Sequence, residues 1–523
     1  MLDHEPIFGK NVIETLSEGM YDNPLFLFRE YVQNAADAID AAVRQSILCE
    51  GEGQIEIVVD AEKRLIVFED NGIGINSTDF KAMLANIGNS IKDRKTDKGF
   101  RGIGRLGGLG YCQKVRFETS AMGESVKSFM EWDARNLHEL LADQNEKISA
   151  GQLIKRITGT WEENCDKGKH YFKVSLVNVN FSSDELLDVE AVRRYLSMVA
   201  PVPFNYERFR FVSDIEAFIK NNNLPALHEY TVNLNGDEVR KGYETPLVLE
   251  KKGRAVSILA VECALLKKHG ETIGWYWYCV SEFDGVLPVS CWQRGFRLRK
   301  ANIQIGEYDC LSNHPRHGQK LWREDRGNNY FLGEVHALDK NLIPNSRRDY
   351  FNQDATCRLF EVALCEEFRG LHNLYHDASK LRSAVTAIRD AEIAKKDFEK
   401  RVKSGLFYND KVREDAQDKV DTALMRAYDA QSILGKFKAE TQTFSGCERK
   451  PVTLLVEKWT EQVHSLQKLP QKLTVNTAKT GLACIRSEDR RVLDEVFEVL
   501  DKMLPLDTAA SIKEAITKRF SRV

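Results

Sequence analysis

Three polar side chains recur at helical spacing in an otherwise apolar stretch near the N-terminus. Glu30, Asn34 and Asp37 lie four and three residues apart in the segment FREYVQNAADA, residues 28–38, so a helix places all three on one face. Such a face is costly to bury unless a polar partner fills it. An amide oxygen can ligate Mg²⁺, and a carboxylate can accept a proton from an attacking water. The spacing therefore predicts a magnesium–nucleotide site or, alternatively, the solvated face of an ordinary helix.

A short turn-like segment further along could bind the base of a nucleotide. The sequence DNGIG, residues 70–74, follows a strand-like run at residues 64–69. The Asp70 carboxylate can accept a hydrogen bond from an adenine amino group, and Gly72 and Gly74 permit a backbone turn close to a ligand. The same residue types also favour a hairpin turn. By itself, this segment predicts either an adenine contact or a plain turn.

A glycine-rich segment, KGFRGIGR at residues 98–105, could bind phosphates. Backbone amides at Gly102, Ile103 and Gly104 could cradle phosphate oxygens at the start of a helix, although a surface loop has the same composition. The polar, basic stretch at residues 89–105 is an improbable core segment. We expect it to form a mobile lid, since closure over a nucleotide needs a weakly packed element.

The order of these segments resembles the Bergerat-fold ATPase domain of the GHKL superfamily, which includes gyrase, heat-shock chaperones, histidine kinases and MutL. Within that superfamily, the chain is most similar to the ninety-kilodalton heat-shock chaperones, the HtpG-like group. Residues 21–30, YDNPLFLFRE, resemble the approach to their catalytic helix, and residues 87–90, IGNS, resemble their lid. Two features depart from the pattern. Arg105 stands where these chaperones usually carry an aromatic residue, and residues 99–102 are equally similar to MutL.

The resemblance implies ATP and Mg²⁺ as cofactors and gives each candidate residue a role. Glu30 would orient or deprotonate the attacking water, and Asn34 would hold Mg²⁺. Asp70 together with Thr160, from a Thr-Gly-Thr segment that opens a predicted strand, would contact adenine. The remaining nucleotide-binding residues that it implies are Asp37, Gly74, Asn89, Gly102, Ile103 and Gly104.

A second arginine-bearing loop could act on the same site from another domain. The segment LIPNSRRD, residues 342–349, resembles the middle-domain loop of these chaperones whose arginine reaches the ATP γ-phosphate. That alignment predicts Arg348 as the catalytic arginine, with Arg347 as a close rival. Such an arginine stabilises charge that develops on the phosphoryl oxygens. On these residues alone, a salt bridge to Asp349 is an equal alternative.

Hydrophobic periodicity predicts an α+β chain in three parts. Residues 1–185 combine helices with paired strands, which predicts a sheet with helices on one face; the resemblance identifies this part as the ATP-binding Bergerat-fold sandwich. Residues 200–370, after a proline-rich joint, are expected to form a middle, transducer-like α+β domain that includes a strand at 230–234. Residues 152–160 are expected to form a further strand of the first part. Residues 371–523 have a period nearer 3.6, which predicts a helical region for oligomerisation or client binding.

A DNA partner would need basic side chains along its path. In the run at residues 292–303, arginines alternate with apolar residues, which predicts a strand with one basic face, although simple surface charge is an alternative. The basic residues that could line a DNA channel are Lys92, Arg94, Lys95, Lys98, Arg101, Arg297 and Arg299.

The composition is that of an ordinary globular protein. Of the 523 residues, 42% are apolar and 29% charged, and the formal net charge is −3. The eleven cysteines show no CxxC pair or zinc spacing, which indicates reduced thiols. The first residues lack the basic and apolar regions of a signal peptide, and no apolar run reaches the length of a membrane span. We therefore expect a cytoplasmic protein without membrane contact.

The leading functional hypothesis is a magnesium-dependent ATPase that acts as a chaperone-like clamp. Hydrolysis would drive an ATP-dependent homodimer to remodel a protein client. The alternative is an ATP-gated clamp on DNA, like MutL or the MORC proteins, which the net charge neither supports nor excludes. A non-catalytic scaffold is disfavoured because Glu30 and Asn34 are both present. A histidine kinase would need a histidine-bearing dimerisation helix before the ATPase region, and a gyrase-type topoisomerase would need a longer chain.

Overall fold

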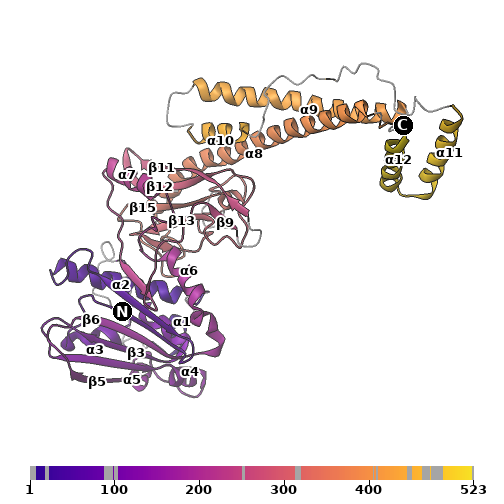
Figure 1. Cartoon of the computed structure of the whole chain (residues 1–523). Helices are drawn as coiled ribbons and strands as arrows, with labels where there is room; N and C mark the ends of the chain where they lie inside the picture. The colour runs from indigo at the N-terminus through magenta and orange to yellow at the C-terminus, as the bar shows by residue number, and fades with distance from the viewer. Residues whose placement is uncertain are drawn as a thin grey trace, which may run out of the picture. The chain divides into compact units, whose positions relative to one another are not determined.

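The computed structural model describes two compact units, which Figure 1 shows together with the remaining chain as a grey trace. The described residues are 8–17, 23–87, 98, 104–249, 254–312, 320–404, 406–407, 410–443, 450–461, 472 and 487–520. One unit comprises Met1–Ser281 with Gly285–His372, and the other comprises Glu282–Asp284 with Asn373–Val523. The predicted fold class is confirmed, because the first unit is mixed α and β with a large sheet and the C-terminal region is helical. The predicted domain boundaries remain predictions.

An eight-stranded sheet, in the order β5-β4-β3-β6-β2-β1-β7-β8, forms the N-terminal part of the first unit. Its strands are β1 (Gln54–Asp60), β2 (Leu65–Asp70), β3 (Cys112–Ser120), β4 (Val126–Asp133), β5 (Thr158–Asn164), β6 (Tyr171–Val179), β7 (Thr231–Leu234) and β8 (Asp237–Glu238). Side chains alternate between two faces along each strand. Ile55 and Ile57 on β1 and Phe68 on β2 are therefore buried on the same face, with Ile57 opposite Phe68.

Helix α2 (Phe26–Arg44) packs on the buried face of this sheet. Phe28 and Tyr31 place their ring centroids 5.3 Å and 4.7 Å from that of Phe68, at distances typical of favourable aromatic pairs. The other helical elements of this part are α1 (Asn11–Ser17), α3 (Ser77–Ala85), η1 (Gly104–Gly110), α4 (Ala134–Ala142), α5 (Ala150–Ile157), η2 (Phe181–Leu187) and α6 (Val189–Val199). The layered α/β arrangement therefore fixes α2 against the centre of the sheet.

The strand predicted at residues 230–234 belongs to the first sheet, so its assignment to the second domain was wrong. Strand β7 pairs in parallel with β1, with Ile55 opposite Val232 and Ile57 opposite Leu234. Val232 and Leu234 are fully buried with the core of that sheet. A segment far along the sequence thus extends the sheet beyond β1, and the local pattern of a short strand cannot reveal which sheet it joins.

The strand predicted at residues 152–160 was also wrong over most of its length. Residues Ala150–Ile157 form helix α5, and β5 starts at Thr158. Ser149 and Gln152 form a reciprocal capping box at the start of this helix, which satisfies two backbone donors and favours the helical turn.

A five-stranded sheet, in the order β11-β12-β15-β13-β14, lies at the centre of the rest of the first unit. Its strands are β11 (Ile258–Lys268), β12 (Glu271–Ser281), β13 (Gly295–Lys300), β14 (Ile303–Ile305) and β15 (Leu332–Ala337). The two-stranded pair β9 (Leu247–Leu249) and β10 (Arg254–Val256), helix α7 (Val212–Asn221) and η4 (Gly327–Tyr330) accompany it. This second sheet agrees with the predicted second α+β region.

The predicted basic face of β13 was wrong, because both of its arginines are buried. Arg297 is 6% exposed and Arg299 is fully buried. Arg299 pairs with the buried Glu334 of β15 at 2.6 Å, and Lys241 approaches the same carboxylate at 3.1 Å. These two cations hold the pKa of Glu334 well below its ordinary value, despite the opposing effect of burial. Both arginines therefore belong to a buried polar core and do not line a surface channel.

The second unit is built from helices. Helix α8 (Ala355–Lys403) begins in the first unit and continues into the second, where α9 (Asp410–Thr443), α10 (Lys450–Thr460), α11 (Ser487–Met503) and α12 (Leu506–Phe520) follow. Phe398 of α8 packs against Phe407, with ring centroids 5.5 Å apart. None of the helices in the described part of the chain combines the length and apolar character that crossing a membrane requires.

Candidate active site

Helix α2 buries the polar face that the sequence places on it. Glu30 is 5% exposed, Asp37 is 3% exposed, and Asn34 is half-buried. The solvated-face alternative therefore does not describe this helix. Phe28 and Tyr31, which hold α2 on the sheet, fix the direction in which the three polar side chains point.

Glu30 lies between two arginines and a glycine. Its Oε1 is 3.3 Å from Nη2 of Arg29 and 3.4 Å from Nε of Arg348. A Cβ atom added at Gly104 would lie 2.8 Å from Oε2 of Glu30, so a larger residue there would displace the carboxylate. Glu30 therefore has two arginine partners at a buried position, as a buried carboxylate requires.

Arg348 reaches this carboxylate from the loop between β15 and α8. Arg348 has a φ of +52°, a conformation uncommon for residues other than glycine. Its backbone N–H donates to the carbonyl of Asn345 at 3.1 Å, and an isolated bridge joins Pro344 to Phe351. This tight turn directs the guanidinium inward, while the neighbouring Arg347 is exposed.

Arg348 is 9% exposed, and its guanidinium joins helix α2 to the backbone at Lys98. Besides its ion pair with Glu30, it donates to the side-chain oxygen of Gln33 on α2 and, at 2.6 Å, to the carbonyl of Lys98. The Asp349 carboxylate accepts from Asn345 at 2.5 Å. The structure therefore brings Arg348, and not Arg347, to Glu30; the catalytic role of either arginine remains a prediction.

The segment from Asp70 to Gly74 docks against the same helix. Ile73 donates its backbone N–H to the carbonyl of Ala38 at 3.1 Å, next to Asp37. Asp70 is 5% exposed and accepts from the backbone N–H of Gly72 at 2.9 Å. Gly74 has a φ of +68°, and an added Cβ would lie 2.0 Å from the carbonyl oxygen of Ser120, so only glycine fits. The structure thus places Asp70, Gly74 and Asp37 in one neighbourhood.

Thr160 does not join this neighbourhood. It is exposed on β5, and β6, β3 and β4 separate that strand from β2, which carries Asp70. At a spacing of about 4.8 Å per strand, the two backbones lie roughly 19 Å apart. The sheet order therefore keeps Thr160 away from Asp70, with which it was predicted to contact adenine.

A different threonine, missed in the sequence, lies beside the Asp70 segment. Thr119 on β3 is fully buried; its hydroxyl accepts from the backbone N–H of Ile75 at 3.0 Å and donates to the carbonyl of Tyr171 at 2.7 Å. Thr119 and Asp70 both lie opposite Phe172 of the strand between them. The alternation of β3 could have indicated that Thr119 points inward, but only the strand order brings it to Asp70.

Three predicted nucleotide-binding residues, Asn89, Gly102 and Ile103, lie outside the described residues, as does most of the expected lid. Gly104 is described, at the start of η1.

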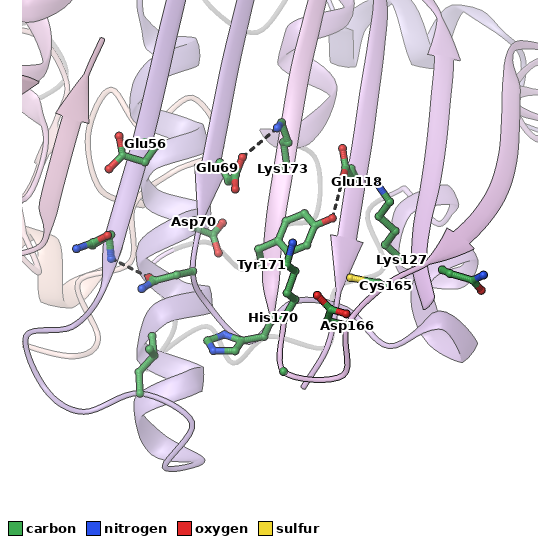
Figure 2. A pocket seen from close by; sticks show the side chains of 16 residues that line it. Glu56, Glu69, Asp70, Glu118, Lys127, Cys165, Asp166, His170, Tyr171 and Lys173 are labelled. Atoms are coloured by element: carbon green, nitrogen blue, oxygen red, sulfur yellow. Dashed lines mark hydrogen bonds and ion pairs between the residues drawn. The ribbon is translucent and has the colours of Figure 1, made fainter. Parts of the chain in front are cut away.

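A hollow of about 780 Å³ lies mainly on the opposite face of the sheet (Figure 2). Asp70 lies at its border, but Glu69 pairs with Lys173 at 3.0 Å, and Tyr171 donates to Glu118 at 2.7 Å. The Glu69 and Glu118 carboxylates therefore already have partners on an outward face. We therefore place the candidate site on the helix-covered face, around Glu30.

Comparison with known proteins defines the class of the N-terminal part. Residues 27–160 match the family described as "Histidine kinase-, DNA gyrase B-, and HSP90-like ATPase". The matched residues include Glu30, Asn34, Asp37 and Asp70. Residues 27–160 are therefore similar to GHKL-type ATPase domains, and the predicted resemblance is confirmed.

Curated relatives of this domain include chaperones named HtpG. The protein from Enterobacter sp. (strain 638) is 25% identical over 203 residues, which cover 35% of this chain and 32% of the relative. The protein from Shewanella loihica is 28% identical over 163 residues, 28% of this chain and 26% of the relative. The protein from Chlorobium phaeovibrioides is 26% identical over 194 residues, 33% of this chain and 30% of the relative. The match thus spans about a third or less of each relative's length.

Proposed function

We propose that this protein binds and hydrolyses ATP at the site around Glu30. The observation that carries the proposal is the contact between Glu30 and Arg348, which lie 3.4 Å apart. Glu30 belongs to the segment that matches GHKL-type ATPases, residues 27–160, whereas Arg348 comes from a distant part of the sequence. A carboxylate and an arginine at one buried point supply the two functions that phosphoryl transfer to water needs. These are orientation of the water and stabilisation of charge on the phosphoryl oxygens.

The roles that we propose are those that the family resemblance implies, given to residues near this site. Glu30 orients the attacking water or accepts its proton, while Arg348 stabilises the developing negative charge. Asp70 accepts a hydrogen bond from the adenine amino group, and Gly74 allows the backbone to approach the base. Asp37 and Gly104 position the backbone around the nucleotide. Thr160 is left out of this proposal because its strand lies far from Asp70.

The donor set on α2 fits a magnesium ion. Asn34 is half-buried one turn from Glu30, and its amide oxygen is a hard ligand of the kind that Mg²⁺ accepts beside phosphate oxygens. We propose that Asn34 holds the ion. When bound, Mg²⁺ neutralises phosphate charge.

The cellular role that we propose is an ATP-dependent, chaperone-like one, with a protein client and a cytoplasmic homodimer. It is supported by the relatives named HtpG and by the helical region after residue 372, which offers surfaces for partners. A DNA-clamping role is not favoured, because Arg297 and Arg299 are buried.

The deciding experiment compares Glu30→Ala with the parent chain. We expect ATP binding, measured by calorimetry, to persist, because the contacts to adenine and magnesium do not involve Glu30. Turnover should fall by about 10²–10⁴-fold, as for loss of a general base. Glu62→Ala is the matched control, since Glu62 is exposed in the turn between β1 and β2. Equal loss of binding and turnover in Glu30→Ala would show that Glu30 is structural.

A further inference from the structure

Lys98 makes polar contacts through its backbone and its side chain. Its backbone N–H donates to Oδ1 of Asp37 at 2.8 Å, and its carbonyl accepts from Nη2 of Arg348 at 2.6 Å. Its ammonium pairs with Asp40 and donates to the hydroxyl of Tyr230 at 2.8 Å. The side chain is only 5% exposed, although lysine is normally among the most exposed residues. Lys98 therefore contacts α2 through its backbone N–H and its ammonium, and it contacts Arg348 through its carbonyl.

Asp40 and Tyr230, which contact the Lys98 ammonium, also contact each other. The Tyr230 hydroxyl donates to Oδ1 of Asp40 at 2.5 Å, and the ammonium lies 5.2 Å from the centre of the Tyr230 ring, within range of a cation–π contact. Burial and the bond to Asp40 raise the pKa of Tyr230 well above its ordinary value, so the hydroxyl keeps its proton and remains a donor. Tyr230 directly precedes β7, and its backbone N–H donates to the carbonyl of Pro201 at 2.9 Å.

Among the described residues, the carbonyl of Lys98 is one of three acceptors that orient the Arg348 guanidinium. The other two, Glu30 and Gln33, both belong to α2. A guanidinium has a planar fork of donors, so acceptors in different directions fix its rotation as well as its position. If the Lys98 carbonyl moved away, a buried donor of Arg348 would lose its acceptor, which is costly.

We infer that Lys98 is a positioning residue for Arg348. Its ammonium, held by Asp40 and Tyr230, fixes its carbonyl, and that carbonyl directs the guanidinium towards Glu30. This inference rests on the proposed ATPase function and adds to it a residue that acts only through another. Lys98 thereby takes a role different from the DNA contact that its charge alone suggested.

The test uses Lys98→Met in the full chain, because methionine keeps the length and apolar stem but removes the ammonium. Misplacing a catalytic group by about 1 Å can cost on the order of 10²-fold, so we expect kcat for ATP to fall about 10- to 100-fold. KM should change by less than about twofold, since the proposed nucleotide contacts are untouched. Tyr230→Phe, which keeps the ring, should give a smaller fall, and Lys98→Arg, which keeps the charge, should restore part of the activity. Lys63→Met is the matched control: Lys63 is a 76% exposed lysine that also pairs with an aspartate.

The Arg348→Ala background separates positioning from a general loss of stability. If Lys98 acts through Arg348, Lys98→Met should cause no further fall in kcat there, because coupled residues are not additive. An undiminished 10- to 100-fold fall in that background would overturn the inference. So would a Lys98→Met chain as fast as the parent. If Lys98→Met does not fold, Tyr230→Phe replaces it in both backgrounds.

A readout without turnover keeps this inference distinct from the proposed function. Hydrogen exchange of the peptide containing residues 345–350 should become faster in Lys98→Met than in the parent and in Lys63→Met, with no ATP present. If the parent hydrolyses no ATP, the proposed function fails, while faster exchange still supports the positioning of Arg348 by Lys98. Unchanged exchange in that peptide overturns the positioning role, whatever the turnover.

Discussion

Replacing Arg348 with alanine should abolish most ATP turnover while leaving ATP binding largely intact. The substitution removes the guanidinium whose Nε lies 3.4 Å from Glu30, the residue proposed to orient the water. An arginine supplied to the transferring phosphoryl group is worth 10³–10⁵-fold in other enzymes. We take the lower end, about a thousandfold or about 4 kcal/mol in activation free energy, because the buried Arg29 also lies 3.3 Å from the Glu30 carboxylate.

The same substitution should cost only modest stability. Breaking a buried ion pair typically costs about 3–5 kcal/mol when one charge is left alone. Glu30 keeps its contact with Arg29, so we expect a loss of about 1–3 kcal/mol in the free energy of unfolding. Arg348→Gly should be no less stable than Arg348→Ala, since φ is +52° at this position and glycine adopts that conformation without strain.

The assay is single-turnover ATP hydrolysis, with calorimetry for binding and thermal melting for stability. Arg347→Ala is the matched control, because Arg347 is adjacent in sequence but exposed; its effect should be mild. An Arg348→Ala chain as fast as the parent would refute the reasoning and leave the contact with Glu30 as a structural salt bridge. A loss of binding as large as the loss of turnover would refute the proposed transition-state role.

Two further predictions concern adenine and acid stability. Asp70→Asn should weaken ATP binding about tenfold or more by calorimetry, because an amide is a poorer acceptor for the adenine amino group; unchanged affinity would remove Asp70 from the base contact. Burial lowers the pKa of His336 from 6.5 to about 4. As the pH falls through 6.5, His336 binds a proton in the unfolded chain but not in the folded chain. The stability that is present above pH 6.5 is therefore lost progressively down to about pH 4. By pH 5 this loss is about 2 kcal/mol, and melting curves at pH 7 and pH 5 should show a smaller drop for His336→Gln than for the parent.

The local sequence predicted those parts of the site that lie on one element. Glu30, Asn34 and Asp37 share a face because the helical period is local, and the structure buries that face. The Asp70 segment was likewise predictable as a glycine turn after a strand. Periodicity could not predict the environment of a side chain. Arg299 is buried with Glu334, which lies on a strand about 35 residues later in the sequence.

Strand order was the main feature of the fold that could not be predicted from the sequence. Thr160 and Thr119 both lie on strands of one sheet, and both carry a hydroxyl that could serve a nucleotide. Nothing in either strand's own pattern tells which of them is nearer to Asp70. The order β5-β4-β3-β6-β2 puts β3 two positions from Asp70 and β5 four positions away. Long-range strand pairing therefore decides that Thr119, and not Thr160, lies beside the Asp70 segment. Long-range pairing also places β7 in this sheet.

Backbone conformation, and not residue type, determines which of Arg347 and Arg348 contacts Glu30. Two adjacent arginines in a loop are chemically equivalent, and the sequence left them as rivals. In the structure, Arg348 takes a φ of +52° and is buried, which costs on the order of 1–3 kcal/mol of backbone strain. Strain of this size persists only where surrounding contacts hold it, and here they are Glu30, Gln33 and the carbonyl of Lys98. If those contacts are what select Arg348, then Lys98→Met should relax the turn, and faster hydrogen exchange at residues 345–350 is the direct measure of that release.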